Sequence, residues 1–194
     1  MRRLGLLILL AAPTAARAEP QAYVEAGVLF GAAAPVIGWN VMPALDGGYR
    51  FADMFWFHAG AAYGPTIDNL GSHGPNHGSN GLARGGVEVR WRASAILVLT
   101  AGLDLGVAHG TWGPPGTPYS QMYGAVDSLS STSFVAIPRV GFEIGGTQLR
   151  ARFGLESNLA IADRTTSQLA GVTRAESTTG TTGIELAAGA AYLW

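Results

Sequence analysis

The segment that decides the fold is residues 149–159, which read LRARFGLESNL. Its odd-numbered positions are apolar apart from Ser157, whereas its even-numbered positions include the charged residues Arg150, Arg152 and Glu156. Because successive side chains of a β-strand point to opposite faces, the segment has one apolar face and one charged face. In a water-soluble protein the apolar face would be the inner one, whereas in a barrel surrounded by lipid it would be the outer one. The rest of the chain has to distinguish these two possibilities.

The first residues of the chain, MRRLGLLILLAAPTAARAEP, have the organisation of a secretory signal peptide. A positively charged start is followed by a short apolar run over residues 4–12, and residues 16–18 (Ala-Arg-Ala) match a small-x-small cleavage site. The alternative, a buried amphipathic helix, does not account for this order of features. We therefore expect residues 1–18 to be a cleaved signal peptide and residues 19–194 to form one exported domain.

The composition narrows the class of function. The chain has no Lys, so all 12 basic residues are Arg; removing the three in residues 1–18 leaves 9 against 13 acidic residues, a net charge near −4. A mildly acidic chain without Lys is a poor nucleic-acid binder, and the absence of Cys rules out disulfides and thiolate metal sites. Only 13% of the residues are charged and the mean hydropathy is +0.22, yet no apolar run of about 18 residues follows the signal peptide. An exported chain this apolar, without a membrane-spanning helix, needs another place for its apolar side chains.

Alternation with a period of two residues divides the exported part into candidate strands. Many Gly residues and frequent turn signals argue against a helical bundle. We predict eight strands, over residues 23–30, 44–51, 55–64, 82–92, 96–108, 132–144, 149–159 and 182–194.

The predicted connections alternate between short and long. Those at 52–54, 93–95 and 145–147 are tight turns, whereas the polar segments between the other strands are longer. Short turns at one end and long loops at the other are typical of bacterial outer-membrane barrels, in which the turns face the periplasm. The even number of strands brings both chain ends to the turn side. The predicted long loops are 31–43, 65–81, 110–131 and 161–181.

The charged faces of the predicted strands hold carboxylates and arginines in equal number. Such balance suits a confined space, where a charge without a partner costs several kcal/mol and where the planar Arg fork can pair bidentately with a carboxylate. The opposite faces carry no charge, as expected of a surface that meets lipid. We therefore predict an eight-stranded barrel with a salt-bridged, plugged interior and no open pore. The predicted interior charges are Glu25, Asp46, Arg50, Arg84, Glu88, Arg90, Arg92, Asp104, Arg139, Glu143, Arg150, Arg152, Glu156 and Glu185.

Aromatic residues gather at the ends of the predicted strands. Two interfacial bands of aromatic side chains are typical of a barrel in a bilayer, whereas ordinary core residues would show no preference for strand ends. The expected bands are Phe51, Phe55, Trp56, Trp91, Tyr192 and Trp194 at the turn side, and Phe30, Tyr63 and Phe134 at the loop side.

The chain resembles the eight-stranded outer-membrane barrels of Gram-negative bacteria, of the outer-membrane protein A and X type, over residues 19–194. The most specific shared motif is the final segment, LAAGAAYLW, because these barrels finish on an amphipathic strand with a terminal aromatic residue that the assembly machinery reads. The family favours Phe at the last position, where this chain has Trp194. The resemblance implies an all-β, antiparallel, up-and-down transmembrane barrel in the outer membrane. It also implies an assembly signal made of Leu186, Ala188, Ala190, Tyr192 and Trp194.

Two chemical alternatives rest on the histidines. His73, His77 and His109, with Asp68, could form a surface metal site, but a Gly-rich loop fixes no ligand geometry and a solvated loop explains them better. A lipid A deacylase would use a His-x-Ser motif and an orienting Glu. His77 to Ser79 have that form and Glu88 follows, yet Glu88 is predicted to point into the barrel.

We therefore predict a non-enzymatic, monomeric integral outer-membrane barrel with a structural or surface-interaction role, in envelope integrity or adhesion. Its expected partners are outer-membrane lipid, the barrel assembly machinery and an unidentified extracellular ligand, and no cofactor or metal is expected. A small pore is the main alternative, and a soluble secreted β-sandwich is a weaker one.

Overall fold

The computed structural model describes residues 19–32, 39–68, 76–112, 128–169, 172–178 and 182–194, so the predicted signal peptide lies outside the described residues. Across these ranges every regular element is a β-strand. No helix in the described ranges is long and apolar enough to cross a bilayer. The strands are β1 (Ala22–Ala32), β2 (Trp39–Ala52), β3 (Phe55–Asp68), β4 (Asn76–Arg92), β5 (Leu97–Trp112), β6 (Ser128–Gly145), β7 (Leu149–Leu169), β8 (Val172–Thr178) and β9 (Thr182–Leu193).

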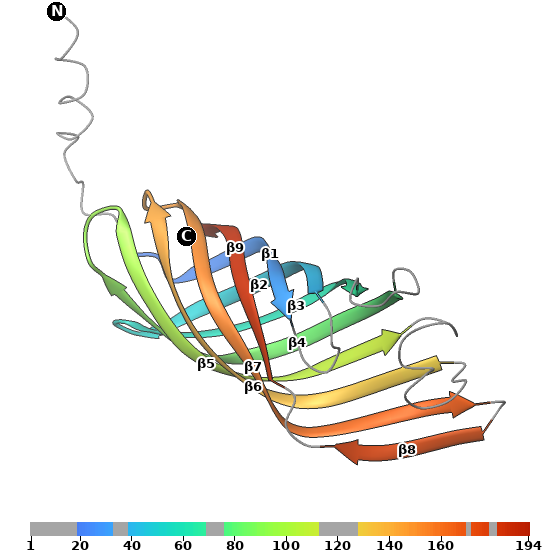
Figure 1. The fold of residues 1–194 in the computed structure, drawn as a ribbon. Helices are drawn as coiled ribbons and strands as arrows, with labels where there is room; N and C mark the ends of the chain where they lie inside the picture. Colours follow the sequence, from blue (N-terminus) through green and yellow to red (C-terminus); the bar gives the residue numbers. More distant parts are fainter. Residues whose placement is uncertain (1–18, 33–38, 69–75, 113–127, 170–171, 179–181) are drawn as a thin grey trace, which may run out of the picture.

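Eight of these strands close into an antiparallel up-and-down barrel, as predicted (Figure 1). Each strand from β1 to β7 pairs with the next, β7 pairs with β9, and β9 pairs with β1 to complete the ring. The backbone N–H groups of Gln21 and Ala22 donate to the carbonyl oxygen of Trp194, at 2.8 and 3.1 Å. Both ends of the barrel segment therefore lie at one end of the barrel, together with the short connections β2–β3, β4–β5 and β6–β7. We call this the turn end and the opposite end the loop end.

The strands are longer than predicted, and one predicted loop contains additional structure. Within the predicted loop 161–181, β7 continues to Leu169 and β8 folds back on it, with Asp163 paired to Thr178 and Leu169 to Val172. The other predicted loops also contain strand residues: β1 and β2 extend into 31–43, β3 and β4 into 65–81, and β5 and β6 into 110–131. In β8 and the outer part of β7, sequence alternation could not reveal the strands, because a strand whose two faces are both polar carries no apolar period.

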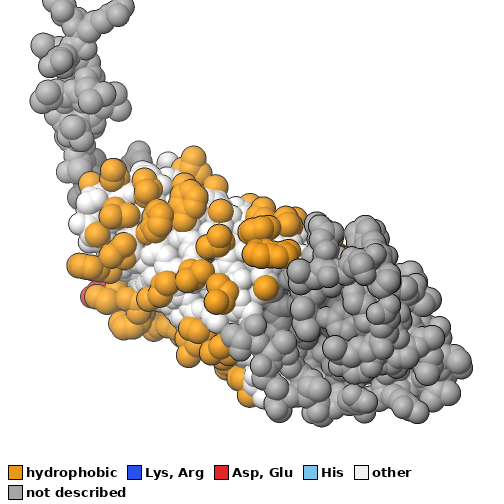
Figure 2. All heavy atoms as spheres, in the orientation of Figure 1, with side chains coloured by type: hydrophobic (Ala, Val, Ile, Leu, Met, Phe, Trp, Pro, Cys, Tyr) orange, Lys and Arg blue, Asp and Glu red, His pale blue; other side chains and the backbone are white. Residues whose placement is uncertain are grey.

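The segment 149–159 turns its apolar face outward. Leu149, Phe153 and Leu155 are 64%, 44% and 46% exposed, whereas Arg150 and Arg152 are buried. The same alternation runs around the barrel, and Figure 2 shows apolar side chains spread over the outer face of the described barrel wall. An exposed apolar surface of this extent marks contact with a membrane or with another protein.

The aromatic residues at the strand ends follow the predicted bands with one exception. Trp56 is only 5% exposed and packs inside the barrel against Tyr23, with ring centroids 5.7 Å apart. Its predicted outward position was wrong because Trp56 has the same parity as the inward-pointing His58. The other predicted band residues are exposed: Phe51, Phe55, Trp91, Tyr192 and Trp194 near the turn end, and Phe30, Tyr63 and Phe134 toward the loop end.

Candidate functional site

The barrel interior contains apolar as well as charged layers. Near the turn end, Tyr23 and Trp56 pack with Ala191 and Leu193. Neither this layer nor a second one on the loop side of the charges was predicted from the sequence, although the residues of both layers have the inward parity of their strands. The second apolar layer consists of Leu29, Met42, Ala62, Leu82, Ala108, Val135 and Ile137.

Most of the residues predicted as interior charges have buried side chains. Arg50 and Arg92 differ, because they lie at the turn-end rim, where their side chains are 15% and 52% exposed. Both have the inward parity, but so close to the strand end there is no opposite wall to cover a long side chain. The buried members are Glu25, Asp46, Arg84, Glu88, Arg90, Asp104, Arg139, Glu143, Arg150, Arg152, Glu156 and Glu185.

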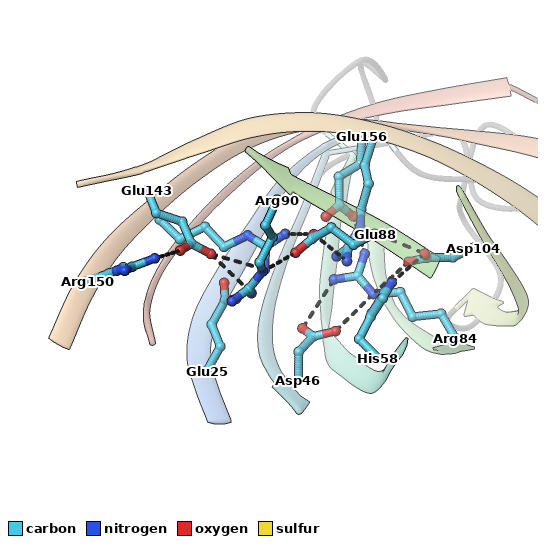
Figure 3. A network of polar contacts seen from close by, with 12 residues as sticks. Glu25, Asp46, His58, Arg84, Glu88, Arg90, Asp104, Glu143, Arg150 and Glu156 are labelled. Atoms are coloured by element: carbon cyan, nitrogen blue, oxygen red, sulfur yellow. Dashed lines mark hydrogen bonds and ion pairs between the residues drawn. The ribbon is translucent and has the colours of Figure 1, made fainter. Parts of the chain in front are cut away.

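One group of buried charges, the turn-side cluster, centres on two carboxylates. Glu88 accepts from Arg90 Nε at 2.6 Å, and it also pairs with Arg152 and with Arg139, whose Nη2 lies at 2.7 Å. Glu143 accepts from Arg150 Nη1 at 3.1 Å. Since each of these carboxylates meets more than one guanidinium, its burial is compensated. The turn-side cluster comprises Glu25, Glu88, Arg90, Arg139, Glu143, Arg150 and Arg152 (Figure 3).

The second group, the loop-side cluster, is organised by Arg84. Its Nε and Nη2 donate to the two carboxylate oxygens of Asp46, both at 3.2 Å, and its Nη1 donates to Glu156. Such fork-to-fork pairing orients the side chains as well as compensating their charge. Figure 3 shows Arg84 among carboxylates of several strands. The loop-side cluster comprises Asp46, His58, Arg84, Asp104, Glu156 and Glu185.

The charges are not evenly distributed between the two clusters. The turn-side cluster has four arginines against three carboxylates, whereas the loop-side cluster has one arginine and His58 against four carboxylates. Arg139 lies between them, with its Nε 3.8 Å from Asp104. Glu185 depends on a neutral partner, because Asn158 Nδ2 donates to it at 2.6 Å. The equal balance expected from the sequence therefore does not hold for the fully buried residues, since two of the seven arginines lie at the rim.

His58 and Asp104 contact each other across an intervening strand. Gly86 of β4 is paired with His58 on one side and with Asp104 on the other, and His58 Nε2 lies 2.7 Å from Asp104 Oδ1. A Cβ on Gly86 would overlap the carbonyl oxygen of Leu103 and lie 2.5 Å from Asp104 Oδ1. Glycine at this position is thus what allows the two side chains to meet.

We expect Gly86→Val to destabilise the folded barrel by about 1–3 kcal/mol, because the added side chain has no space and separates His58 from Asp104. The measurement is urea unfolding of the protein in phospholipid vesicles. Gly85→Ala is the matched control, since a Cβ there meets its nearest atom, the carbonyl oxygen of His58, at an ordinary 3.4 Å. Equal stability of the Gly86 variant and the control would contradict this account.

The space left between the charged side chains is small. A cavity of about 20 Å³ lies in the middle of the barrel, lined by Asp46, Arg84, Arg139, Arg152 and Glu156 among others. Such a volume holds about one water molecule. The charged layer is therefore packed at this level.

The proposed deacylase residues are not assembled with each other. Ser79 and Glu88 have opposite parity on β4 and lie nine residues apart, about 30 Å along a strand. The Ser79 hydroxyl lies 2.9 Å from that of Thr111, and Glu88 is held by arginines inside the barrel. His77 is part of β4, not of a loop as predicted, and is paired with Ile67.

The metal-site residues are only partly described. His73 lies outside the described residues, whereas His109 is an exposed residue of β5 whose Nδ1 lies 2.8 Å from Thr132 Oγ1. Among the residues that the structure describes, no group of three or more His, Cys, Asp or Glu is placed to hold a metal ion.

Comparison with solved structures identifies the architecture. Neisserial surface protein A aligns over 89% of this chain and 96% of its own, with a TM-score of 0.60 and 12% identity. This is the fold of an eight-stranded outer-membrane barrel. OprG of Pseudomonas aeruginosa aligns over 91% of this chain and 97% of its own (TM-score 0.55, 11% identity). The N-terminal barrel domain of Pseudomonas aeruginosa OprF aligns over 92% and 100% (TM-score 0.53, 13% identity).

Comparison by sequence finds no match for this chain. No protein-family model matches the chain, and no curated protein matches it. At 11–13% identity the likeness to the solved barrels concerns the fold alone.

Proposed function

We propose that the chain is an integral outer-membrane barrel protein with a structural or surface-interaction role, and that it is not an enzyme. The outward face of the barrel wall is apolar, whereas the arginines and carboxylates lie inside it. An apolar outer face is stable when lipid surrounds it. The closed ring also suits a bilayer, because it leaves no unpaired strand edge within the lipid. By the usual orientation of such barrels, the turn end faces the periplasm and the loop end faces outward.

The observation that carries the binding role is the sheet that extends beyond the ring at the loop end. Strand β8 pairs with the outer part of β7 and, among the described strands, with no other (Figure 1). Its second edge therefore offers backbone N–H and C=O groups to an incoming chain. Edge strands of this kind bind extended segments of partner proteins by strand addition. We propose that β8 is the contact surface for a partner outside the cell.

Replacement of residues 163–178 by a short Gly-Ser linker should abolish partner capture and leave the barrel folded. Extended peptides selected on the intact protein from a phage-displayed random library serve as the probe. The variant should keep the heat-dependent gel mobility of a folded barrel, because the ring does not include β8 and the remaining part of β7 keeps its pairing with β6 and with β9.

A site-specific reporter complements this deletion. The chain contains no Cys, so Ala175→Cys in β8 gives a single labelling position. A selected peptide should quench or shift a fluorophore at this position but not one at Ser94→Cys in the β4–β5 turn. Equal binding to the intact and hairpin-deleted proteins would refute the role of β8.

The plugged interior distinguishes this proposal from a small pore. Two apolar layers flank the buried ion pairs, and the mid-barrel cavity has room for about one water molecule. We expect the protein in a planar bilayer to show no steady single-channel current. Large, stable conductance steps that depend on the folded protein would favour the pore.

We further propose that the last strand carries the assembly signal. Leu186, Tyr192 and Trp194 are 58%, 47% and 58% exposed on the outer side of β9, and Ala188 and Ala190 share that face. The assembly machinery can therefore reach the whole apolar stripe from the lipid side. Trp194→Ala should lower the amount of folded protein in the outer membrane in cells, whereas refolding of the purified chain in detergent should be little affected.

A further inference from the structure

The turn-end mouth of the barrel contains a second, larger cavity, of about 120 Å³. Four arginines from three strands line it, whereas only two carboxylates do. Such a volume exceeds the need of a single water molecule several-fold. The charged lining residues are Arg50, Arg90, Arg92 and Arg150, with Glu19 and Asp53.

Arg90 is the deepest of these arginines and is held rigidly. Its guanidinium carbon lies 4.0 Å from the ring centroid of Tyr23 and 4.5 Å from that of Trp56, and its Nε donates to Glu88. Its side chain is only 4% exposed, yet its buried Nη1 has no hydrogen-bond partner. Its Nη2 lies 3.1 Å from Glu143 Oε1, so Nη1 is the nitrogen without any acceptor among the described residues. A buried guanidinium N–H without an acceptor is costly, and because Arg90 lines the cavity, an acceptor that enters the cavity has access to this side chain.

The carboxylate of Glu19 shows how an anion can bind to the rim arginines of this cavity. The Glu19 carboxylate pairs with Arg50 and lies 3.9 Å from Arg92 Nη1, beyond hydrogen-bond distance. Asp53 is likewise 3.9 Å from Arg50 Nη2 and is fully exposed to solvent. The donors of Arg92 thus have no close carboxylate among the described residues. Glu19 occupies part of the place that an external oxyanion would take.

We infer that the turn-end mouth is a binding site for a phosphate-type oxyanion, held between Arg92, Arg50 and the buried Arg90. Planar guanidinium groups match the oxygens of phosphate, and several of them around one cavity compensate a doubly charged group. Either free phosphate or the phosphate of a phospholipid headgroup at the neighbouring membrane surface supplies this chemistry. The inference is independent of the binding role proposed for β8.

The test is titration of the folded protein, in a non-ionic detergent at constant ionic strength, with inorganic phosphate and separately with a short-chain phosphatidylglycerol. Calorimetry should show saturable binding that Arg92→Gln weakens by roughly tenfold or more, as the loss of a charge-assisted contact implies. Glu19→Gln should tighten binding, because it removes the competing carboxylate. Arg92 is a half-exposed rim residue, so its replacement should leave folding intact.

Arg164→Gln is the matched control, since it removes the same charge from an exposed position on the outer part of β7. Binding of phosphate alone that depends on Arg92 would identify a free anion as the ligand. Binding of the lipid alone would identify a headgroup. No saturable binding of either, or equal weakening by the Arg92 and Arg164 replacements, would overturn the inference.

Discussion

Arg152→Leu is expected to lower the free energy of unfolding by about 3–5 kcal/mol, because it leaves the buried carboxylate of Glu25 without its ion-pair partner. Arg152 Nη1 donates to Glu25 at 3.0 Å, and the other nitrogen of its fork donates to Glu88. Glu88 keeps Arg90 and Arg139, whereas Arg152 is the one ion-pair partner found for Glu25 among the described residues. The measurement is equilibrium unfolding by urea in phospholipid vesicles.

Two further variants separate this effect from a general loss of charge. Arg164→Leu removes an exposed arginine and should change the stability by no more than about 0.5 kcal/mol. The double variant Arg152→Leu, Glu25→Gln should recover part of the loss, because the orphaned carboxylate is removed as well. Unchanged stability of Arg152→Leu would show that water reaches the interior and that the barrel is not plugged at this level.

Leu103→Arg should cost about 2–4 kcal/mol in a bilayer and strongly reduce the folded fraction. Leu103 is 57% exposed in the middle of β5, so an arginine there would face the hydrocarbon core. In a water-soluble protein the same exposed position would accept an arginine within about 0.5 kcal/mol. The replacement therefore tests directly which solvent surrounds the barrel.

Leu149→Arg provides the comparison for Leu103→Arg. Leu149 is 64% exposed and begins β7 at the turn end, where an arginine can reach the headgroup region, so the expected cost is about 0–1 kcal/mol. Both variants are measured by unfolding in vesicles and by the gel shift between boiled and unboiled samples. Equal stability of the two variants would indicate that water surrounds the protein, as the alternative of a soluble secreted β protein requires.

The closed barrel could be predicted from the sequence because charged and apolar residues alternate along the strands of the ring, with the apolar residues on the outer face. In residues 149–159 this alternation separates an apolar face from a charged one, and the balance of carboxylates and arginines over all the predicted strands indicates that the charged face is the inner one. The prediction failed where that contrast is lost. Strand β8 and the outer part of β7 lie beyond the closed ring and have no apolar period, so their sequence predicts a loop. The outward position predicted for Trp56 is wrong because its parity, which it shares with His58, turns the side chain inward although it lies at a strand end.

The candidate sites were less accessible from the sequence. Parity placed Glu88 and Arg152 on inner faces, but only the register of several strands shows that they meet. The contact of His58 with Asp104 depends on Gly86 in the strand between them, and no local sequence pattern predicts that these three residues lie side by side. The arginine-lined mouth unites β2, β4 and β7, whose residues are far apart in the chain.

The pairing of β1 with β9 also constrains the order of events in folding. Tyr23 is paired with Leu193, so the ring closes through a contact that spans most of the chain. Contacts between such distant positions are slow to form, and until they form both terminal strands expose open edges that invite aggregation. The ring therefore stays open until its last strand, β9, has paired with its first. Closure of the ring by β1 and β9 is then the final, committing step of folding.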